Sequence, residues 1–203
     1  MNHIFERGQS DVTLLLLHGT GGNEHDLLPI GRMVDPDANL LGVRGNVLEN
    51  GMPRFFKRLR EGVFDLEDLF ERTDELKAFL DQAAKELEFA RDKVVAIGYS
   101  NGANIAGSLL FRHGQALKGA ILHHPMVPFR NTALPDMTGV PIYIGAGKMD
   151  PLCPPDETKE LESLFKKAGA DVSLYWEDGG HQLTHREIEQ AKSWYETHIK
   201  AKK

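Results

Sequence analysis

The sequence contains little that would point to a disulfide-stapled, membrane-spanning or nucleic-acid-binding protein. Its single cysteine, Cys153, excludes an internal disulfide. The apolar run at residues 12–17 is far shorter than the roughly 20 residues that span a membrane, and the N-terminus lacks a basic-then-apolar signal pattern. With 24 Lys and Arg against 30 Asp and Glu, the net charge of −6 offers no attraction for nucleic acid or anionic lipid. We therefore expect a cytoplasmic protein with no nucleic-acid partner and no membrane partner.

Short apolar runs alternate along the chain with longer stretches in which apolar residues recur every three or four positions. This alternation is typical of repeated βα units. The predicted strands span residues 12–17, 39–43, 94–99, 119–124, 140–147 and 172–177. The predicted helices span residues 25–33, 67–89, 102–111, 155–167 and 184–199. Because most of these strands are apolar throughout, we predict an α/β fold with a mostly parallel central sheet flanked by helices.

No break in composition divides the 203 residues, of which 41% are hydrophobic and 27% charged. We therefore predict one domain over residues 1–203. Residues 44–65 form the least regular part of the chain. A connection this long inside a compact domain is either functional or hides an element that the pattern does not reveal.

The most informative motif is Gly-Tyr-Ser-Asn-Gly at residues 98–102, which follows an apolar strand and opens a predicted helix. This is the G-x-S-x-G pattern of a nucleophile elbow, in which a tight turn lifts the serine hydroxyl clear of the sheet. Gly98 and Gly102 would supply the room that such a turn needs. The motif predicts Ser100 as a nucleophile; the alternative is that Ser100 only caps the helix.

A nucleophilic serine needs a histidine base and an acid that orients this base. Asp150 follows the strand predicted at 140–147, and His181 follows the last predicted strand. Both would lie at the C-terminal edge of the sheet, where open α/β sheets bind their ligands. The chain order Ser, Asp, His is the order of α/β hydrolases. We therefore predict Ser100, Asp150 and His181 as a catalytic triad, although Asp150 could instead cap a turn and His181 could be an ordinary loop residue.

Other acids and histidines compete for these roles. Asp178 lies so close to His181 in the chain that it favours shaping the loop, and His185 is expected to be exposed. A last pair, His123 and His124, ends a strand before a proline, which favours buried, hydrogen-bonded histidines. The remaining alternative acids are Asp156 and Glu177.

Two backbone N–H groups should stabilise the oxyanion of a tetrahedral intermediate. One belongs to Asn101, directly after the serine, and the other to Thr20 in the glycine-rich loop after the first predicted strand. This loop lacks the lysine of a phosphate-binding loop and the spacing of a dinucleotide fold. No metal-ligand spacing occurs, so we expect neither a metal nor another cofactor.

Five segments together resemble a known family: HGTGGNE, RGNVLENGMPRFF, GYSNGAN, DPLCPP and GGHQL. They are similar to the small α/β-hydrolases of the carboxylesterase/phospholipase type, near the dienelactone hydrolases, and above all to the bacterial MhqD-like hydrolases. The resemblance runs from about Leu14 to His198. It implies an α/β-hydrolase fold with the same triad and oxyanion donors. Acyl-protein thioesterases carry glutamine after the serine where this sequence has Asn101, so the sequence departs from their pattern at this position, although the backbone N–H is kept.

The chain is too short for a large cap domain, which predicts an open site for a small, short-chain carboxylic ester. Residues 44–65 are a candidate wall of this site; the alternative is that their phenylalanines are core and their basic residues form a solvated face. In either case Cys153 is expected to be a buried structural thiol. The candidate substrate contacts are His18, Arg44, Met52, Phe55 and Met126, with Arg54 as a further group that could hold an anion.

Several functions share this machinery. A thioesterase, a lysophospholipase or a dienelactone-type hydrolase would need the same triad, because the difference lies in the shape of the pocket. A non-catalytic ligand-binding protein on a hydrolase fold is the alternative from another class. A homodimer is compatible with the sequence, although no apolar stripe identifies an interface.

Overall fold

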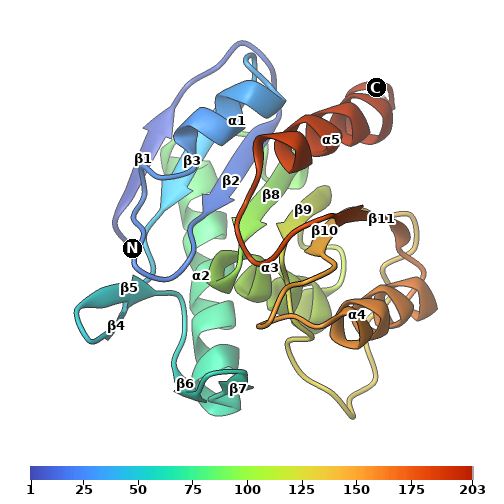
Figure 1. The fold of residues 1–203 in the computed structure, drawn as a ribbon. Helices are drawn as coiled ribbons and strands as arrows, with labels where there is room; N and C mark the ends of the chain where they lie inside the picture. The colour runs from blue at the N-terminus through green and yellow to red at the C-terminus, as the bar shows by residue number, and fades with distance from the viewer. Residues whose placement is uncertain (203) are drawn as a thin grey trace.

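The computed structural model describes residues 1–202 and is built around one twisted β-sheet (Figure 1). In this part of the chain the sheet has seven strands in the order β1-β3-β2-β8-β9-β10-β11. The edge strand β1 pairs antiparallel with β3, and all other neighbours pair in parallel. The strands are β1 (His3–Glu6), β2 (Thr13–Leu17), β3 (Asn39–Val43), β8 (Val94–Tyr99), β9 (Gly119–His123), β10 (Pro141–Gly147) and β11 (Asp171–Glu177).

Helices cover both faces of the sheet, which explains why the central strands are apolar throughout. Successive side chains of a strand point to opposite faces. Leu15 and Leu17 of β2 therefore pack on one face, whereas Leu14 and Leu16 pack on the other. The first face is covered by α2 (Leu66–Glu86), α3 (Asn101–His113) and α4 (Pro155–Lys167). The second is covered by α1 (Leu28–Val34) and α5 (His185–Tyr195), which continues as a π-helical turn at Glu196–Lys200.

Local sequence signals explain where several helices begin. The side chain of Asp65 accepts a hydrogen bond from the Asp68 N–H at the start of α2. At the start of α5, Thr184 and Glu187 form a reciprocal capping box. The helix α4 begins at Pro155, whose missing N–H costs nothing in the first turn. A 3₁₀ turn at Arg91–Lys93 leads into β8.

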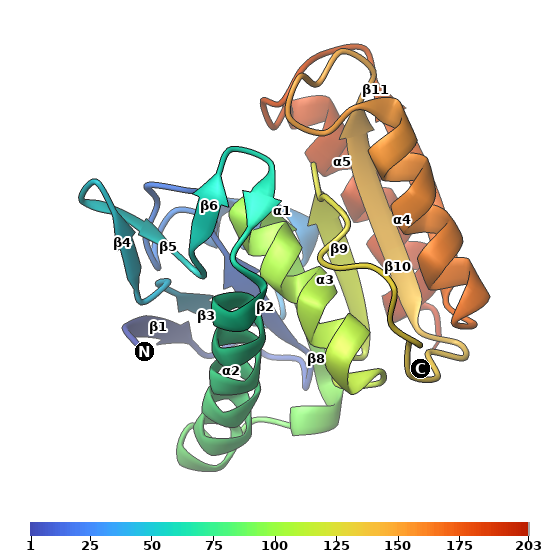
Figure 2. The ribbon, with the colours of Figure 1, turned by 90° about the horizontal axis from the view of Figure 1, so that it is seen from below.

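Residues 44–65 contain two β-hairpins, so this segment hides elements that the sequence pattern did not reveal, which was one of the two alternatives. The first hairpin pairs β4 (Val47–Glu49) with β5 (Met52–Arg54), and the second pairs β6 (Arg58–Arg60) with β7 (Val63–Phe64). Asn50 and Gly51 both have positive φ, as a tight hairpin turn requires. Such short strands lack the apolar run by which the sheet strands were recognised. Figure 2 shows both hairpins on the side of the molecule that lies away from α4 and α5.

Along residues 1–202, no helix combines the length and the apolar character that crossing a lipid bilayer requires.

Candidate active site

Ser100 stands in a tight turn between β8 and α3, with φ 52° and ψ −112°. This backbone conformation is uncommon for residues other than glycine and stores roughly 1–3 kcal/mol of strain. The two flanking glycines make the turn feasible. A Cβ atom at Gly98 would lie 2.6 Å from the Gly102 carbonyl oxygen, and one at Gly102 would lie 2.0 Å from the Leu17 carbonyl oxygen. Larger side chains at either position would therefore push the elbow off the sheet.

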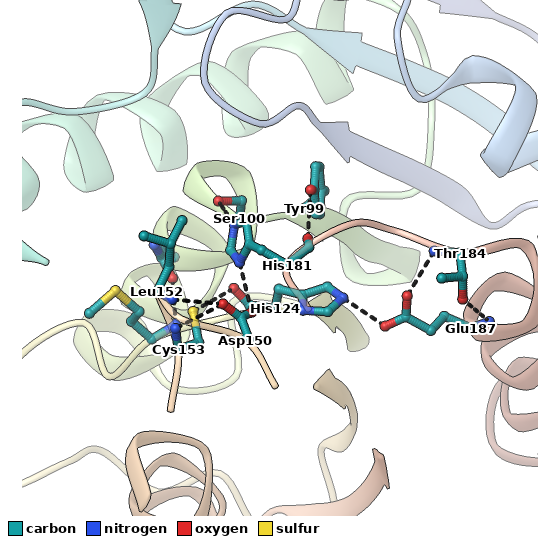
Figure 3. Close-up of polar contacts among 11 residues, drawn as sticks. Tyr99, Ser100, His124, Asp150, Leu152, Cys153, His181, Thr184 and Glu187 are labelled. Atoms are coloured by element: carbon teal, nitrogen blue, oxygen red, sulfur yellow. Dashed lines mark hydrogen bonds and ion pairs between the residues drawn. The ribbon is translucent and has the colours of Figure 1, made fainter. Parts of the chain in front are cut away.

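The hydroxyl of Ser100 faces His181 rather than capping α3 (Figure 3). Its Oγ lies 2.8 Å from Nε2 of His181, and Nδ1 of His181 lies 2.7 Å from Oδ2 of Asp150. An ionised carboxylate only accepts hydrogen bonds, so Nδ1 donates and Nε2 is left to accept from the serine. The structure thus brings together the three residues that the motifs selected. The Tyr99 hydroxyl donates to the His181 carbonyl oxygen at 2.8 Å and fixes its backbone.

Asp150 is buried, and its environment keeps it ionised. Burial alone would raise its pKa, but hydrogen bonds from His181 and from the N–H groups of Leu152 and Cys153 outweigh burial and hold the pKa below its usual value. These backbone groups donate to Oδ1 at 2.9 and 3.1 Å. The negative charge of Asp150 therefore persists at neutral pH and favours one tautomer of His181.

Sequence reasoning missed a second layer behind Asp150. His124 Nδ1 lies 3.0 Å from Asp150 Oδ2, and His124 Nε2 lies 2.7 Å from Glu187 Oε1. The ligand atoms of His124, Asp150 and His181 lie within 4.8 Å of one another, a spacing that could also suit a metal ion. Hydrogen bonds between these groups account for their closeness. The sequence feature that could have indicated these contacts is the His-His pair at the end of a buried strand.

The loop predicted to carry an oxyanion donor is fastened to the first hairpin. Arg54 Nη1 donates to Thr20 Oγ1 at 2.6 Å, and the Gly21 N–H donates to the Pro53 carbonyl oxygen at 2.9 Å. The same strand reaches the elbow, because the Phe55 N–H donates to Asn101 Oδ1 at 2.7 Å. Both candidate donor residues are thus held by residues 53–55.

A cavity of about 470 Å³ opens above Ser100. It is lined by the glycine-rich loop at Gly19 and Thr20, the turn at Ser100, His181 and the hairpin β6–β7. The lining residues are Gly19, Thr20, Arg54, Arg58, Glu61, Gly62, Phe64, Tyr99, Ser100, Asn101, Asn104, Met126, Pro151, Leu152, Cys153 and His181. This set of residues, polar and apolar in similar measure, suits a small ligand with a polar group.

Of the five candidate substrate contacts, Met126 lines the cavity and the other four lie outside its lining. His18 is buried below the oxyanion loop, where Nδ1 donates to the Gly19 carbonyl oxygen at 2.6 Å and Nε2 accepts from the Gly45 N–H at 3.0 Å. Burial lowers the pKa of His18, which keeps it neutral in this role. Arg44 pairs instead with Glu24, at 2.6 and 3.0 Å.

The remaining two contacts are corrected in the same way. Phe55 is a core residue whose ring lies 4.6 Å from that of His18, and Met52 is 41% exposed beside Gly21. Arg54, directly before Phe55, is the residue of this segment that lines the cavity. Without knowledge of the hairpin, the sequence could not tell which of these residues faces the site.

The residues that competed with Asp150 and His181 for the roles of acid and base pair with residues outside the triad. Asp178 is exposed and pairs with Lys148 at 2.6 Å, whereas His185 is exposed and pairs with Glu189 at 3.2 Å. Cys153 is buried, and burial raises the pKa of its thiol well above the usual range. Its Sγ donates to the His124 carbonyl oxygen at 3.4 Å. The Cys153 thiol is therefore uncharged and packed beside the site, as a structural residue would be.

Comparison with known proteins gives the family. The model of the dienelactone hydrolase family matches residues 57–202. The "Putative hydrolase MhqD" of Bacillus subtilis (strain 168) is 65% identical over 199 residues, which cover 98% of this chain and 100% of that protein. The crystal structure of the Bacillus cereus carboxylesterase is 58% identical and superposes with a TM-score of 0.97, covering 98% of this chain and 95% of that one.

A third similar structure, YahD with malic acid, is 32% identical with a TM-score of 0.92 and covers 97% of this chain and 98% of that one. The family match covers more than half of the chain, and the relatives are more than 30% identical over nearly its whole length. The chain therefore belongs to the dienelactone hydrolase family and is a carboxylesterase-like hydrolase with the α/β-hydrolase fold.

Proposed function

We propose that this protein is a serine carboxylesterase that cleaves small, short-chain carboxylic esters through an acyl-serine intermediate. Ser100 is the nucleophile, His181 the general base and Asp150 the acid that orients it. One observation carries the proposal: Ser100 Oγ, His181 and Asp150 form a continuous hydrogen-bonded line at 2.8 and 2.7 Å, at the floor of a cavity. A non-catalytic binding protein would have no need of this line.

In the first half of the reaction, Ser100 Oγ attacks the ester carbonyl carbon while His181 Nε2 takes the hydroxyl proton. The carbonyl oxygen becomes an oxyanion, which accepts hydrogen bonds from the N–H groups of Thr20 and Asn101. The tetrahedral intermediate then expels the alkoxide, and His181 gives it the proton. An acyl-serine and a free alcohol result.

In the second half, a water molecule takes the place of the alcohol. His181 Nε2 removes one of its protons as the water oxygen attacks the acyl carbon, and the same oxyanion donors act again. The intermediate collapses, the acyl–oxygen bond to Ser100 breaks, and His181 returns the proton to Ser100 Oγ. The carboxylic acid leaves and the enzyme is regenerated.

The cavity supports a small substrate with a polar or anionic end. A volume of about 470 Å³ accommodates a short acyl chain, and the lining includes Arg54 and Arg58, which share one ion-pair partner, Glu49. Burial lowers the pKa of Arg54 to about 10, which still leaves it cationic at neutral pH. A structure of the similar protein YahD is described as being with malic acid, a dicarboxylic acid. Short esters that carry a carboxylate are therefore the substrates we favour.

The test is hydrolysis of p-nitrophenyl esters from acetate to palmitate by the native protein and by Ser100→Ala, together with an acyl-thioester and a dienelactone. We expect cleavage of short chains and a loss on the order of 10⁴–10⁶-fold in kcat for Ser100→Ala. A fluorophosphonate probe should label the native protein only. Equal rates for both proteins, or labelling that survives the substitution, would remove Ser100 as the nucleophile.

A further inference from the structure

His124 lies behind the triad, between two buried carboxylates. It follows β9 directly with a φ of 55°, and its side chain is fully buried. Nδ1 lies 3.0 Å from Oδ2 of Asp150, the same oxygen that His181 contacts at 2.7 Å. Nε2 lies 2.7 Å from Oε1 of Glu187, whose side chain is also fully buried. Figure 3 shows the resulting row from Ser100 to Glu187.

The two carboxylates determine the charge of His124. Ionised carboxylates accept hydrogen bonds and cannot donate them, so each ring nitrogen must carry a proton. Two buried negative charges would also repel each other strongly without a cation between them. Accordingly, although burial opposes the charged form, Glu187 and Asp150 raise the pKa of His124 and His124 lowers that of Glu187.

The other groups that face His124 leave this balance in place. The ring of His181 lies 5.3 Å from that of His124 and the ring of Tyr99 lies 6.1 Å away, while the Cys153 thiol contacts the His124 carbonyl oxygen. The neighbouring His123 is fully buried and has its pKa lowered to about 4, so it is neutral.

Glu187 connects the row to the loop that carries His181. Its Oε2 accepts from the Thr184 N–H at 2.8 Å, while Thr184 Oγ1 accepts from the Glu187 N–H at 3.2 Å. This capping box fixes the start of α5 at its N-cap Thr184, three residues after His181. The Glu187 carboxylate thus contacts both His124, behind Asp150, and Thr184, at the end of the loop that carries His181.

We propose that His124 and Glu187 are positioning residues for ester hydrolysis: a positively charged His124 holds Asp150 Oδ2 and moderates its negative field, and Glu187 keeps His124 charged and in place. This inference rests on the proposed function of the same site. Neither residue touches the substrate. They act through Asp150. Its Oδ2 contacts His124 and His181, and its Oδ1 accepts hydrogen bonds from two backbone N–H groups.

The charge of His124 has a consequence for the pH dependence of the reaction. Active enzyme needs a neutral His181, and the negative field of Asp150 favours the protonated form of His181. His124 opposes this field with its positive charge. Removing that charge should therefore move the acid limb of the kcat/KM profile to higher pH, because His181 would keep its proton over a wider range.

The experiment compares three variants on p-nitrophenyl acetate from pH 5 to 9. His124→Asn leaves an amide that can still donate to Asp150 but carries no charge, and Glu187 then lacks its counterion. The double variant His124→Asn/Glu187→Gln removes one charge of each sign and restores the net charge of the row. His185→Asn is the matched control, because His185 makes a similar carboxylate pair on the exposed side of α5.

For His124→Asn we expect kcat to fall about 10–100-fold with KM within twofold, and the acid limb to move to higher pH. The acid limb should return toward the native position in the double variant and stay unchanged in His185→Asn. Thermal unfolding confirms that each variant is folded. A folded His124→Asn with native kcat overturns the proposal, and so does a lower kcat with an unmoved acid limb, which a merely structural role would give.

A measurement on the native chain keeps the inference testable if a variant does not fold. With ¹⁵N-labelled histidine, NMR should show one buried ring with both nitrogens protonated up to at least pH 8, in the native protein and in Ser100→Ala. A neutral tautomer at His124 near pH 7 overturns the proposal. The NMR result does not depend on catalysis, so it separates a failure of this inference from a failure of the proposed esterase activity.

Discussion

Two adjacent histidines at the end of β9 have opposite electrostatic environments. His124 faces Asp150 and Glu187, which outweigh the effect of burial and raise its pKa. His123 lies on the other side of the backbone, where burial lowers its pKa to about 4. Within residues 1–202, neither of its ring nitrogens has a hydrogen-bond partner. The same side chain is therefore cationic at one position and neutral at the next.

His123 should make the protein sensitive to acid. Below the ordinary value of 6.5 the unfolded chain binds a proton at His123, whereas the folded chain binds it only near pH 4. Stability contributed by neutral His123 is thus present above pH 6.5 and lost as pH falls toward 4, by about 2–3 kcal/mol. We expect His123→Leu to reduce this loss, as urea unfolding at pH 7, 5.5 and 4 would measure. Parallel curves for both proteins would contradict the prediction, and the exposed His185→Leu serves as control.

The hairpin β4–β5 acts as a support for the oxyanion loop. It contacts Thr20 through Arg54 and Gly21 through Pro53, and the residue that follows it, Phe55, contacts Asn101. Arg54 is only 3% exposed and also donates from Nε to the Phe56 carbonyl oxygen at 3.1 Å. A change in the hairpin should therefore reach the groups that bind the oxyanion, although the hairpin is remote from the triad in sequence.

Substituting Arg54→Met should disturb this support while keeping much of the side-chain volume. The Thr20 hydroxyl loses its donor, and we expect kcat for the neutral ester p-nitrophenyl acetate to fall about 10–100-fold as the oxyanion donors shift. Steady-state kinetics would measure this, with the exposed Arg60→Met on β6 as the matched control. Unchanged kcat in a folded Arg54→Met would show that the loop holds its geometry without the hairpin.

The whole molecule places its site where the C-terminal ends of the parallel strands meet. Ser100 follows β8, His124 follows β9, Asp150 lies beyond β10 and His181 lies beyond β11. Since these four strands are neighbours in the sheet, the loops after them converge on one edge. The packing of helices on both faces is what holds this edge in register.

The central strands should therefore dominate stability. Ile97 of β8 is fully buried on the face that α1 and α5 cover. We expect Ile97→Ala to lower the free energy of unfolding by about 2–5 kcal/mol, because it removes buried methyl groups and leaves a cavity. Leu48→Ala on the first hairpin, at a residue 70% exposed, should change it by no more than about 0.5 kcal/mol. Urea unfolding compares the two, and similar losses would contradict the prediction.

The α/β architecture and the residues proposed as the triad follow from patterns that are local in the sequence. All six predicted strands are present within about one residue of their predicted ends, because buried parallel strands are apolar throughout. The helix predictions are also correct in number and place, although α1 begins at Leu28 rather than at residue 25. The motif around Ser100 needed only local information, since glycine spacing and the flanking strand and helix define the elbow.

The surroundings of these residues, by contrast, depend on how the chain folds in three dimensions. The edge strand β1, the two hairpins, the Arg54 contact with Thr20 and the row from Asp150 through His124 to Glu187 all depend on contacts between segments that lie far apart in the chain. A local pattern reports which face of an element is buried, but not which charged group meets which across the fold. The proposed nucleophile could therefore be predicted from a pentapeptide, whereas the residues that support it could not, because they meet only where distant loops converge.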